Sequence, residues 1–136
     1  MRQLIALVAL VATAACSMDT ATTEPIVGSL AGAYTLRTMN GSPLPFTIVG
    51  RGDTTVHIDT DVILMTDGGD WNEKVNYRLS VGTAAAIDTS FTLLGTWSRV
   101  GNTVSFRIPG GPIYVGTASD TSMSLTDGAF RYLFVR

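Results

Sequence analysis

The sequence is short of the residues that most often build disulfides, metal sites and nucleic-acid surfaces. It has one cysteine and one histidine in 136 residues, so neither an intramolecular disulfide nor a cysteine-rich metal site can form within the chain. Charged residues make up only 15%, and 9 basic against 11 acidic residues give a net charge of −2 with no block of one sign. A nucleic-acid-binding protein is expected to carry a basic stripe. We therefore expect no nucleic-acid partner, no metal and no cofactor.

A long apolar run is also missing. A membrane-spanning helix needs about 20 apolar residues, and the N-terminal apolar run, Leu4 to Ala12, is much shorter. It follows a positive start, Met1-Arg2, and precedes the small residues Thr13-Ala14-Ala15. This order of segments predicts a secretion signal rather than a membrane span.

The single cysteine, Cys16, directly follows these small residues and so resembles the lipobox of bacterial lipoproteins. In that family the signal is cut before the cysteine, whose thiol and new amino group are acylated. The resemblance implies a signal peptide over residues 1–15, lipidation at Cys16 and a lipid anchor in the membrane. Ser17 resembles outer-membrane sorting, which places the domain in the cell envelope, facing the periplasm or the surface. Ala12-Thr13-Ala14 also fits ordinary signal cleavage, so secretion without an anchor is the alternative.

The next segment, Ser17 to Ser29, is polar, rich in threonine and without periodicity. It predicts a flexible tether over residues 16–29, which spans roughly 20 Å as a coil. The folded domain is then expected over residues 30–136.

The rest of the chain alternates between apolar and polar residues. The hairpin from Phe91 to Ile108 is the central example, because period-two alternation continues on both sides of Gly101-Asn102. Trp71 to Val81 is the cleanest single strand, with Glu73 as the only polar residue on its inward face. Asn40-Gly41 is the strongest two-residue hairpin signal. Gly82 to Ser90 is expected to be a loop.

A long extended run from Thr54 to Thr66 completes this set, and a β-bulge is expected near Thr60. Simple alternation divides its side chains between two faces. One face carries Val56, Ile58, Val62 and Leu64, and the other carries His57, Asp59 and Asp61.

Eight or nine short strands joined by tight turns indicate an all-β sandwich or barrel. Since nearly every connection is local, we predict a small antiparallel up-and-down β-barrel of about eight strands, preceded by the signal peptide and the tether. Closure requires the final strand, Ala129 to Val135, to pair antiparallel with the first, Ala33 to Met39.

Several of these segments resemble the lipocalin-like domains of bacterial lipoproteins. The segments that carry the resemblance are Leu30 to Leu36, Asn40 to Pro45, Thr66 to Trp71, Gly95-Thr96-Trp97, Gly101 to Val104, Leu125 to Gly128 and Tyr132 to Phe134. The resemblance covers about Leu30 to Arg136. It implies a lipocalin-like barrel, and it supports the fold better than the function.

Candidate sites for chemistry are few. His57, Asp59 and Asp61 offer ligand atoms on one strand face, but alternate residues of a strand lie about 6.5–7 Å apart, which favours a solvated outer face over a metal site. One histidine among many serines and threonines selects no catalytic nucleophile. We therefore expect no enzymatic activity.

Inward-pointing aromatic residues are better candidates for a binding site. They are Tyr34, Trp71, Tyr77, Phe91, Trp97 and Phe106. An eight-stranded barrel either fills with such side chains or encloses one small ligand. The sequence thus predicts a binding module for a small apolar ligand. The alternative is a structural, protein-interaction or enzyme-inhibitor protein of the envelope, with a filled barrel in which these residues form the core.

Overall fold

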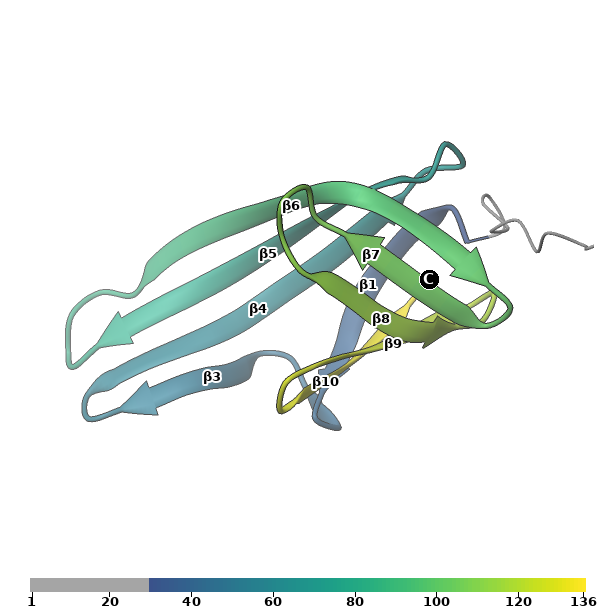
Figure 1. Ribbon diagram of the computed structural model, residues 1–136. Coiled ribbons are helices and arrows are strands. Elements are labelled where there is room, and N and C mark those ends of the chain that lie inside the picture. Colours follow the sequence, from purple (N-terminus) through teal and green to yellow (C-terminus); the bar gives the residue numbers. More distant parts are fainter. Residues whose placement is uncertain (1–29) are drawn as a thin grey trace, which may run out of the picture.

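A computed structural model describes residues 30–136, which form ten β-strands (Figure 1). The strands are β1 (Gly32–Met39), β2 (Ser42–Pro43), β3 (Phe46–Arg51), β4 (Thr54–Met65), β5 (Asp70–Val81), β6 (Ile87–Val100), β7 (Thr103–Arg107), β8 (Ile113–Ala118), β9 (Ser122–Asp127) and β10 (Phe130–Val135). This part of the chain holds no helix long and apolar enough to cross a membrane. The signal peptide and tether predicted over residues 1–29 lie outside the described residues.

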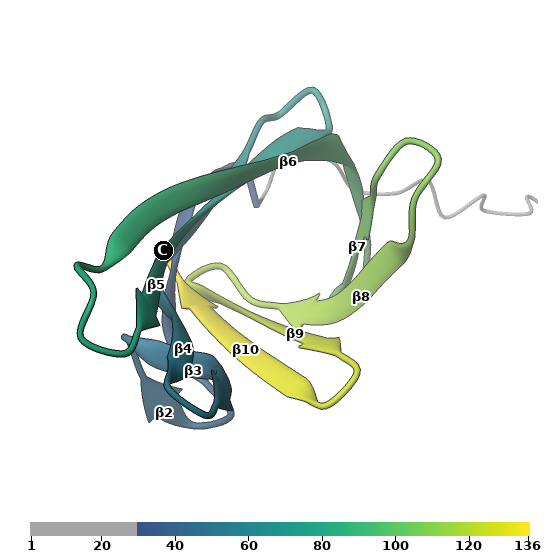
Figure 2. The ribbon, with the colours of Figure 1, turned by 90° about the vertical axis from the view of Figure 1, so that its left-hand side faces the viewer.

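Eight of the strands close into an antiparallel up-and-down barrel, as the sequence predicts. Each strand from β4 to β9 pairs with the next strand along the chain, and β1 pairs with both β10 and β4. Seen along its axis, the barrel is a closed ring of strands (Figure 2). Among the described residues, β2 and β3 lie at the two ends of the strand order, and the first half of β6, which pairs only with β5, is a further open edge.

The first strand divides its pairing between two neighbours. Its second half pairs antiparallel with β10, from Thr35 opposite Val135 to Met39 opposite Tyr132. Its first half, from Gly32 onward, pairs with the end of β4. The predicted pairing of the first and last strands is confirmed, and β1 is the strand that closes the ring.

The chain between β1 and β4 turns back at Asn40 and Gly41, the predicted hairpin turn. Both residues have positive φ, 53° and 81°, which asparagine and glycine tolerate best. The chain then forms β2 and β3 at the edge of the sheet, and β3 pairs with the first half of β4. As a result, β3 to β6 extend past the barrel as a curved, four-stranded sheet (Figure 1). We call this part the extension.

One strand begins earlier than the sequence analysis predicts. The loop expected over Gly82 to Ser90 ends at Ala86, and β6 begins at Ile87, which pairs with Leu79 of β5. Asp88, Thr89 and Ser90 are consecutive polar residues, so the apolar–polar alternation that predicts a strand is missing here. They belong to a strand because the backbone of β5 supplies the hydrogen-bonding partner, and their side chains remain exposed.

One end of the barrel is tightly packed. Trp97, Tyr34 and Leu30 are buried there, and the Trp97 indole Nε1 donates a hydrogen bond of 3.0 Å to the carbonyl oxygen of Thr66. Gly95 permits this packing, since a Cβ at this position would lie 2.0 Å from the Arg107 carbonyl oxygen. The opposite end of the barrel adjoins the extension and contains a cavity.

Candidate functional site

A β-bulge in β4 changes which side chains face the barrel interior. The register moves by one residue between Ile58, which pairs with Tyr77, and Thr60, which pairs with Asn76. Because side chains alternate along a strand, one extra residue reverses the faces of everything that follows it. The interior of the barrel therefore receives Asp61 beyond the bulge.

The sequence analysis places the bulge near Thr60 correctly but assigns the following side chains to the wrong faces. Asp61, predicted on a solvated outer face, is only 2% exposed. Leu64, predicted inward with Val62, is 43% exposed, whereas Ile63 and Met65 are buried. Simple alternation fails here because it takes no account of the residue that the bulge inserts.

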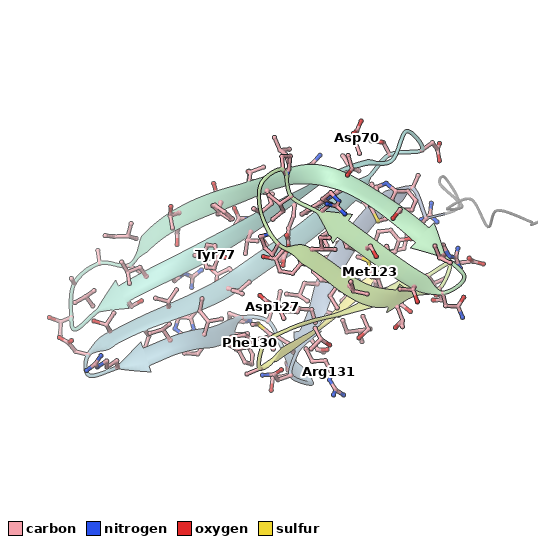
Figure 3. All side chains as sticks on the ribbon, in the orientation of Figure 1. Asp70, Tyr77, Met123, Asp127, Phe130 and Arg131 are labelled. Atoms are coloured by element: carbon pink, nitrogen blue, oxygen red, sulfur yellow. The ribbon has the colours of Figure 1, made fainter. Side chains whose placement is uncertain are left out.

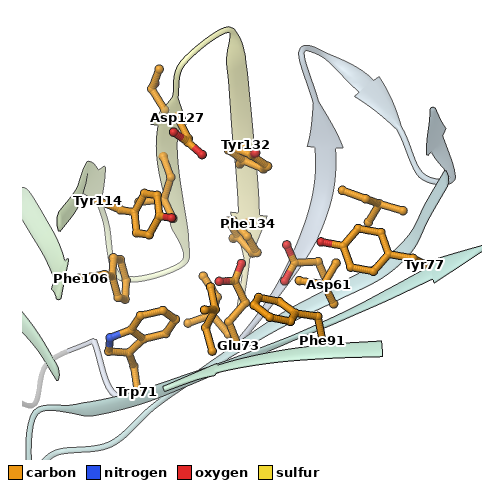
Figure 4. A pocket seen from close by; sticks show the side chains of 16 residues that line it. Asp61, Trp71, Glu73, Tyr77, Phe91, Phe106, Tyr114, Asp127, Tyr132 and Phe134 are labelled. Atoms are coloured by element: carbon orange, nitrogen blue, oxygen red, sulfur yellow. The ribbon is translucent and has the colours of Figure 1, made fainter. Parts of the chain in front are cut away.

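Asp61 meets a second acidic residue inside the barrel. Glu73, the polar residue predicted on the inward face of Trp71 to Val81, does face the interior from β5. Asp61 pairs with Val75, so Glu73 lies diagonally across from it on the adjacent strand. The two carboxyl groups face each other (Figure 4) and share a hydrogen bond. We call Asp61 and Glu73 the carboxyl pair.

The surroundings of the carboxyl pair disfavour two negative charges. Burial is the main cause that raises the pKa of Asp61 to about 8, and the neighbouring charge of Glu73 raises it further. Burial also raises the pKa of Glu73. Both shifts favour the neutral forms, so the pair retains a proton to a higher pH than two exposed carboxyl groups would. Oδ1 of Asp61 has no hydrogen-bond partner within residues 30–136.

The carboxyl pair lies on the wall of a partly open cavity of about 230 Å³. Apolar and aromatic side chains supply most of the lining. The lining residues are Ile58, Asp61, Ile63, Trp71, Glu73, Val75, Tyr77, Phe91, Leu93, Phe106, Tyr114, Leu125, Thr126, Asp127, Tyr132 and Phe134. They come from the seven consecutive strands β4 to β10, with Phe106 as the residue from β7. The cavity therefore exists only because the barrel closes.

Polar groups also reach the cavity from several other positions, including Tyr77, Asp127 and Tyr132. The Tyr77 hydroxyl points toward Asp61 in Figure 4, and burial is the main cause that raises the pKa of this tyrosine. Tyr132 is half-buried there, and this partial burial is the main cause that raises its pKa to about 12. Asp127 lies at the end of β9, on the side of the barrel near Tyr77 and away from Met123 (Figure 3). A few polar groups in a mostly apolar lining are typical of small-molecule sites.

The six predicted aromatic residues divide between the cavity and the packed end. Trp71, Tyr77, Phe91 and Phe106 line the cavity, with the Trp71 and Phe106 rings edge-to-face at 5.2 Å. Tyr34 and Trp97 are buried at the packed end and do not reach the cavity. Sequence periodicity assigns residues to the inward face, but it does not say at which height along the barrel the interior is filled.

An apolar surface continues the cavity wall onto the extension. Val49, Val56, Leu79 and Ile87 pair in register across β3 to β6 and so form one row on the inward-facing side. Leu79 lies two residues beyond the cavity residue Tyr77 on the same face. Val49 is 48% exposed and Ile87 is 60% exposed. We call these four residues the apolar row.

The three residues considered as metal ligands do not converge. His57 contacts Thr47 through Nδ1 at 3.0 Å, and Asp59 forms an ion pair of 2.8 Å with Arg78. Asp61 faces the opposite side, inside the barrel. Within residues 30–136, no group of three or more histidine, cysteine or acidic side chains is arranged to hold a metal ion.

Sequence reasoning found Glu73 and Tyr77 on the inward face, but it missed Asp61, Tyr114 and Tyr132. The sequence predicts a bulge near Thr60, but the exact position of the bulge, which decides the face of Asp61, is set by pairing with β5. Nothing in the local pattern marks Tyr114 or Tyr132 as neighbours of this pair, because β8 and β10 reach it only around the closed ring.

Asp61→Asn should make the stability of the barrel less dependent on pH. The folded state raises the pKa of Asp61 from 3.8 to about 8, so it binds a proton that the unfolded chain releases above pH 4. Stability should therefore fall between about pH 4 and 8, by up to about 1.4 kcal/mol for each pH unit, and this loss should shrink in the variant. Urea unfolding at pH 5, 6.5 and 8 measures this pH dependence of the unfolding free energy.

Asp88→Asn, which removes an exposed carboxylate, is the control and should show the same pH dependence as the parent protein. Equal pH dependence of all three proteins would contradict a buried, protonated Asp61.

Comparisons of the chain with protein-family models, with curated proteins and with solved structures found no match. The functional argument therefore rests on the geometry of the barrel.

Proposed function

We propose that this protein is a non-catalytic binding module whose barrel takes up a small, largely apolar ligand. The observation that carries the proposal is the cavity of about 230 Å³ among Trp71, Phe91, Phe106 and Phe134. A dry apolar cavity of about 150 Å³ is already large enough to bind benzene. The space is below the range of about 300–1,000 Å³ for typical ligand sites, so it suits a compact molecule of roughly one aromatic ring.

The apolar row supports the same proposal. It lies directly beyond Tyr77 on the inward-facing side of the extension, so a ligand entering from this end meets apolar side chains before it reaches the cavity. The packed end around Trp97 and Tyr34 closes the other approach.

Neutral aromatic probes test the binding function directly. In NMR titrations with toluene and benzyl alcohol, the amides around Trp71, Val75 and Phe106 should shift in a saturable way. Leu93→Trp should abolish these shifts, because the larger side chain fills the cavity. Leu94→Trp is the matched control, because Leu94 is the next residue along β6 but is 64% exposed and lies outside the cavity. Shifts that never saturate, or that survive Leu93→Trp unchanged, would contradict the proposal.

The second candidate is a structural or interaction protein, including an inhibitor of an envelope enzyme. The exposed apolar row favours it, because a row of exposed apolar side chains at one barrel end is also what a protein partner would cover. Val49→Ser/Ile87→Ser separates the two candidates. If the cavity is the functional site, the affinity of this double variant for toluene should stay within about threefold of the parent's. If the apolar row is instead a contact surface for a protein partner, the variant should lose binding of that partner.

We further propose that the domain is a lipoprotein of the cell envelope, anchored to the outer membrane through Cys16. The resemblance of residues 13–16 to a lipobox supports this location, as does the resemblance of the barrel segments to lipocalin-like domains of bacterial lipoproteins. A lipid anchor would hold the barrel and its ligand near the membrane.

Cys16→Ser should prevent lipid attachment, because the thioether needs the cysteine thiol. In a bacterial host supplied with a palmitate analogue, the parent protein should become labelled and sediment with membranes. The variant should be unlabelled and remain in the soluble fraction. Ser17→Ala, which keeps the thiol, serves as the control and should be labelled like the parent. Equal labelling of the Cys16→Ser variant and the parent would contradict lipidation at Cys16.

A further inference from the structure

The carboxyl pair is an unusual feature in a cavity whose lining is mostly apolar and aromatic. Asp61 is 2% exposed, its Oδ1 has no hydrogen-bond partner in residues 30–136, and its other neighbours include Val75 and Ile63. Burial of a polar group without a full set of partners costs free energy. Apolar residues of similar volume would fill the same positions without this cost, so the core alone gives no reason for two acids here.

The cavity also lacks a positive charge to balance the pair. The other titratable groups that face it are Tyr77 on β5, Tyr114 on β8, Asp127 on β9 and Tyr132 on β10. The β6 and β7 residues in the wall are Phe91, Leu93 and Phe106, and none of the described lining residues is lysine, arginine or histidine. The site therefore presents hydrogen-bond acceptors and negative charge inside a ring of aromatic side chains.

We propose that the ligand is a compact ammonium ion with an apolar body, whose amino group binds Asp61 and Glu73 while its body contacts the aromatic wall. This inference rests on the binding function proposed above and specifies the ligand's chemical class. A primary ammonium group donates three hydrogen bonds, enough to reach both carboxyl groups, including the Oδ1 of Asp61 that has no partner within residues 30–136. Hydrogen bonds between ionised groups are the strong ones.

Other ligand classes fit the same atoms less well. A divalent metal prefers a larger set of oxygen or nitrogen ligands than two carboxyl groups, and residues 30–136 contain no group of three. A neutral alcohol can bond to the pair but leaves its charge unbalanced, and an anion would be repelled by it. The rings of Tyr77, Phe91 and Tyr132 add cation–π attraction that only a cation receives.

Binding of a cation should displace a proton from the pair. Burial makes the free pair retain a proton to a higher pH than exposed carboxyl groups do, and a bound ammonium group makes loss of that proton easier by balancing the negative charge that forms. Affinity for an amine should therefore rise several-fold from pH 6 to pH 8, a range in which the amine itself remains protonated. Affinity for a neutral alcohol should change much less.

Isothermal titration calorimetry with three probes of matched size tests the inference on residues 16–136 and on the full-length protein. The probes are benzylamine, benzyl alcohol and benzoate, which share one ring and differ in charge. In the parent protein at pH 7.5, benzylamine should bind at least tenfold more tightly than benzyl alcohol, and benzoate should not bind. Heats measured in buffers of different ionisation enthalpy should reveal proton release with benzylamine only.

Two variants assign this preference to the carboxyl pair. Asp61→Asn/Glu73→Gln keeps side-chain size but removes both charges, and it should bind benzylamine and benzyl alcohol within threefold of each other. Asp88→Asn removes an exposed carboxylate and should keep the parent's preference. Circular dichroism confirms folding of each variant, and the pH dependence of benzylamine binding to the parent needs no variant at all.

Each result has a separate meaning for the two proposals. If benzyl alcohol binds as tightly as benzylamine to the parent, the ammonium inference is wrong and the binding module stands. A preference for benzylamine that survives in the double variant would overturn the role of Asp61 and Glu73. If neither benzylamine nor benzyl alcohol binds, both this inference and the binding function fail, and the interaction protein remains.

Discussion

Deletion of Tyr132 to Arg136 should abolish cooperative folding of the barrel. These residues include most of β10, which pairs with β9 on one side and with β1 on the other. Their loss removes the buried Phe134 side chain and reopens the ring, leaving two unpaired strand edges. Near-UV circular dichroism and urea unfolding should show no folded baseline for the truncated chain.

Amide hydrogen exchange identifies the reason for this loss. In the intact protein the Thr35–Met39 amides that bond to β10 should exchange slowly, and in the truncated chain this protection should disappear. Phe134→Ala is the matched control, because it removes the core side chain but keeps the backbone of β10. It should cost about 3–5 kcal/mol and retain slow exchange in β1. A truncated chain that still unfolds cooperatively would mean that closure by β10 is not required.

Trp97→Ala should lower the free energy of unfolding by about 3–5 kcal/mol. The indole is 3% exposed at the packed end, and its Nε1 donates to the Thr66 carbonyl oxygen in the turn before β5. The variant leaves a large cavity and removes one of the two hydrogen bonds that the Thr66 carbonyl oxygen accepts, the other being from the Gly69 N–H, and both losses destabilise the fold.

Urea or thermal unfolding measures this loss, and Leu94→Ala on the same strand is the control. Leu94 is 64% exposed, so its replacement should change the unfolding free energy by less than about 1 kcal/mol. A midpoint for Trp97→Ala that barely differs from the parent's would show that the packed end contributes little. Binding of toluene should survive in Trp97→Ala at a temperature where it remains folded, because Trp97 does not line the cavity.

The difference between Trp97 and Trp71 shows what the alternation of apolar and polar residues can predict and what it cannot. Both are inward residues of predicted strands, and both are buried. Their functions differ because Trp71 borders the cavity and Trp97 fills the packed end. That difference depends on the height of each residue in the barrel, which is set by the stagger of neighbouring strands.

The carboxyl pair required a further step beyond the sequence. Glu73 is recognisable on its own, as the single polar residue on the inward face of a regular strand. Asp61 is not, because its face depends on a bulge whose position is decided by pairing with β5. Alternation without the bulge places Asp61 in solvent and leaves Glu73 without a neighbour.

Local chemistry in the sequence by itself determined the class of fold, the hairpin at Asn40-Gly41 and the inward face of Trp71 to Val81. These features depend on residues adjacent in the chain, through alternation and turn preference. Only the tertiary structure decided that β1 pairs with both β4 and β10, that the barrel is filled at one end and hollow at the other, and that Asp61 meets Glu73. The physical reason is that strand register and ring closure are set by hydrogen bonds between distant segments, and a shift of one residue exchanges the two faces of a strand.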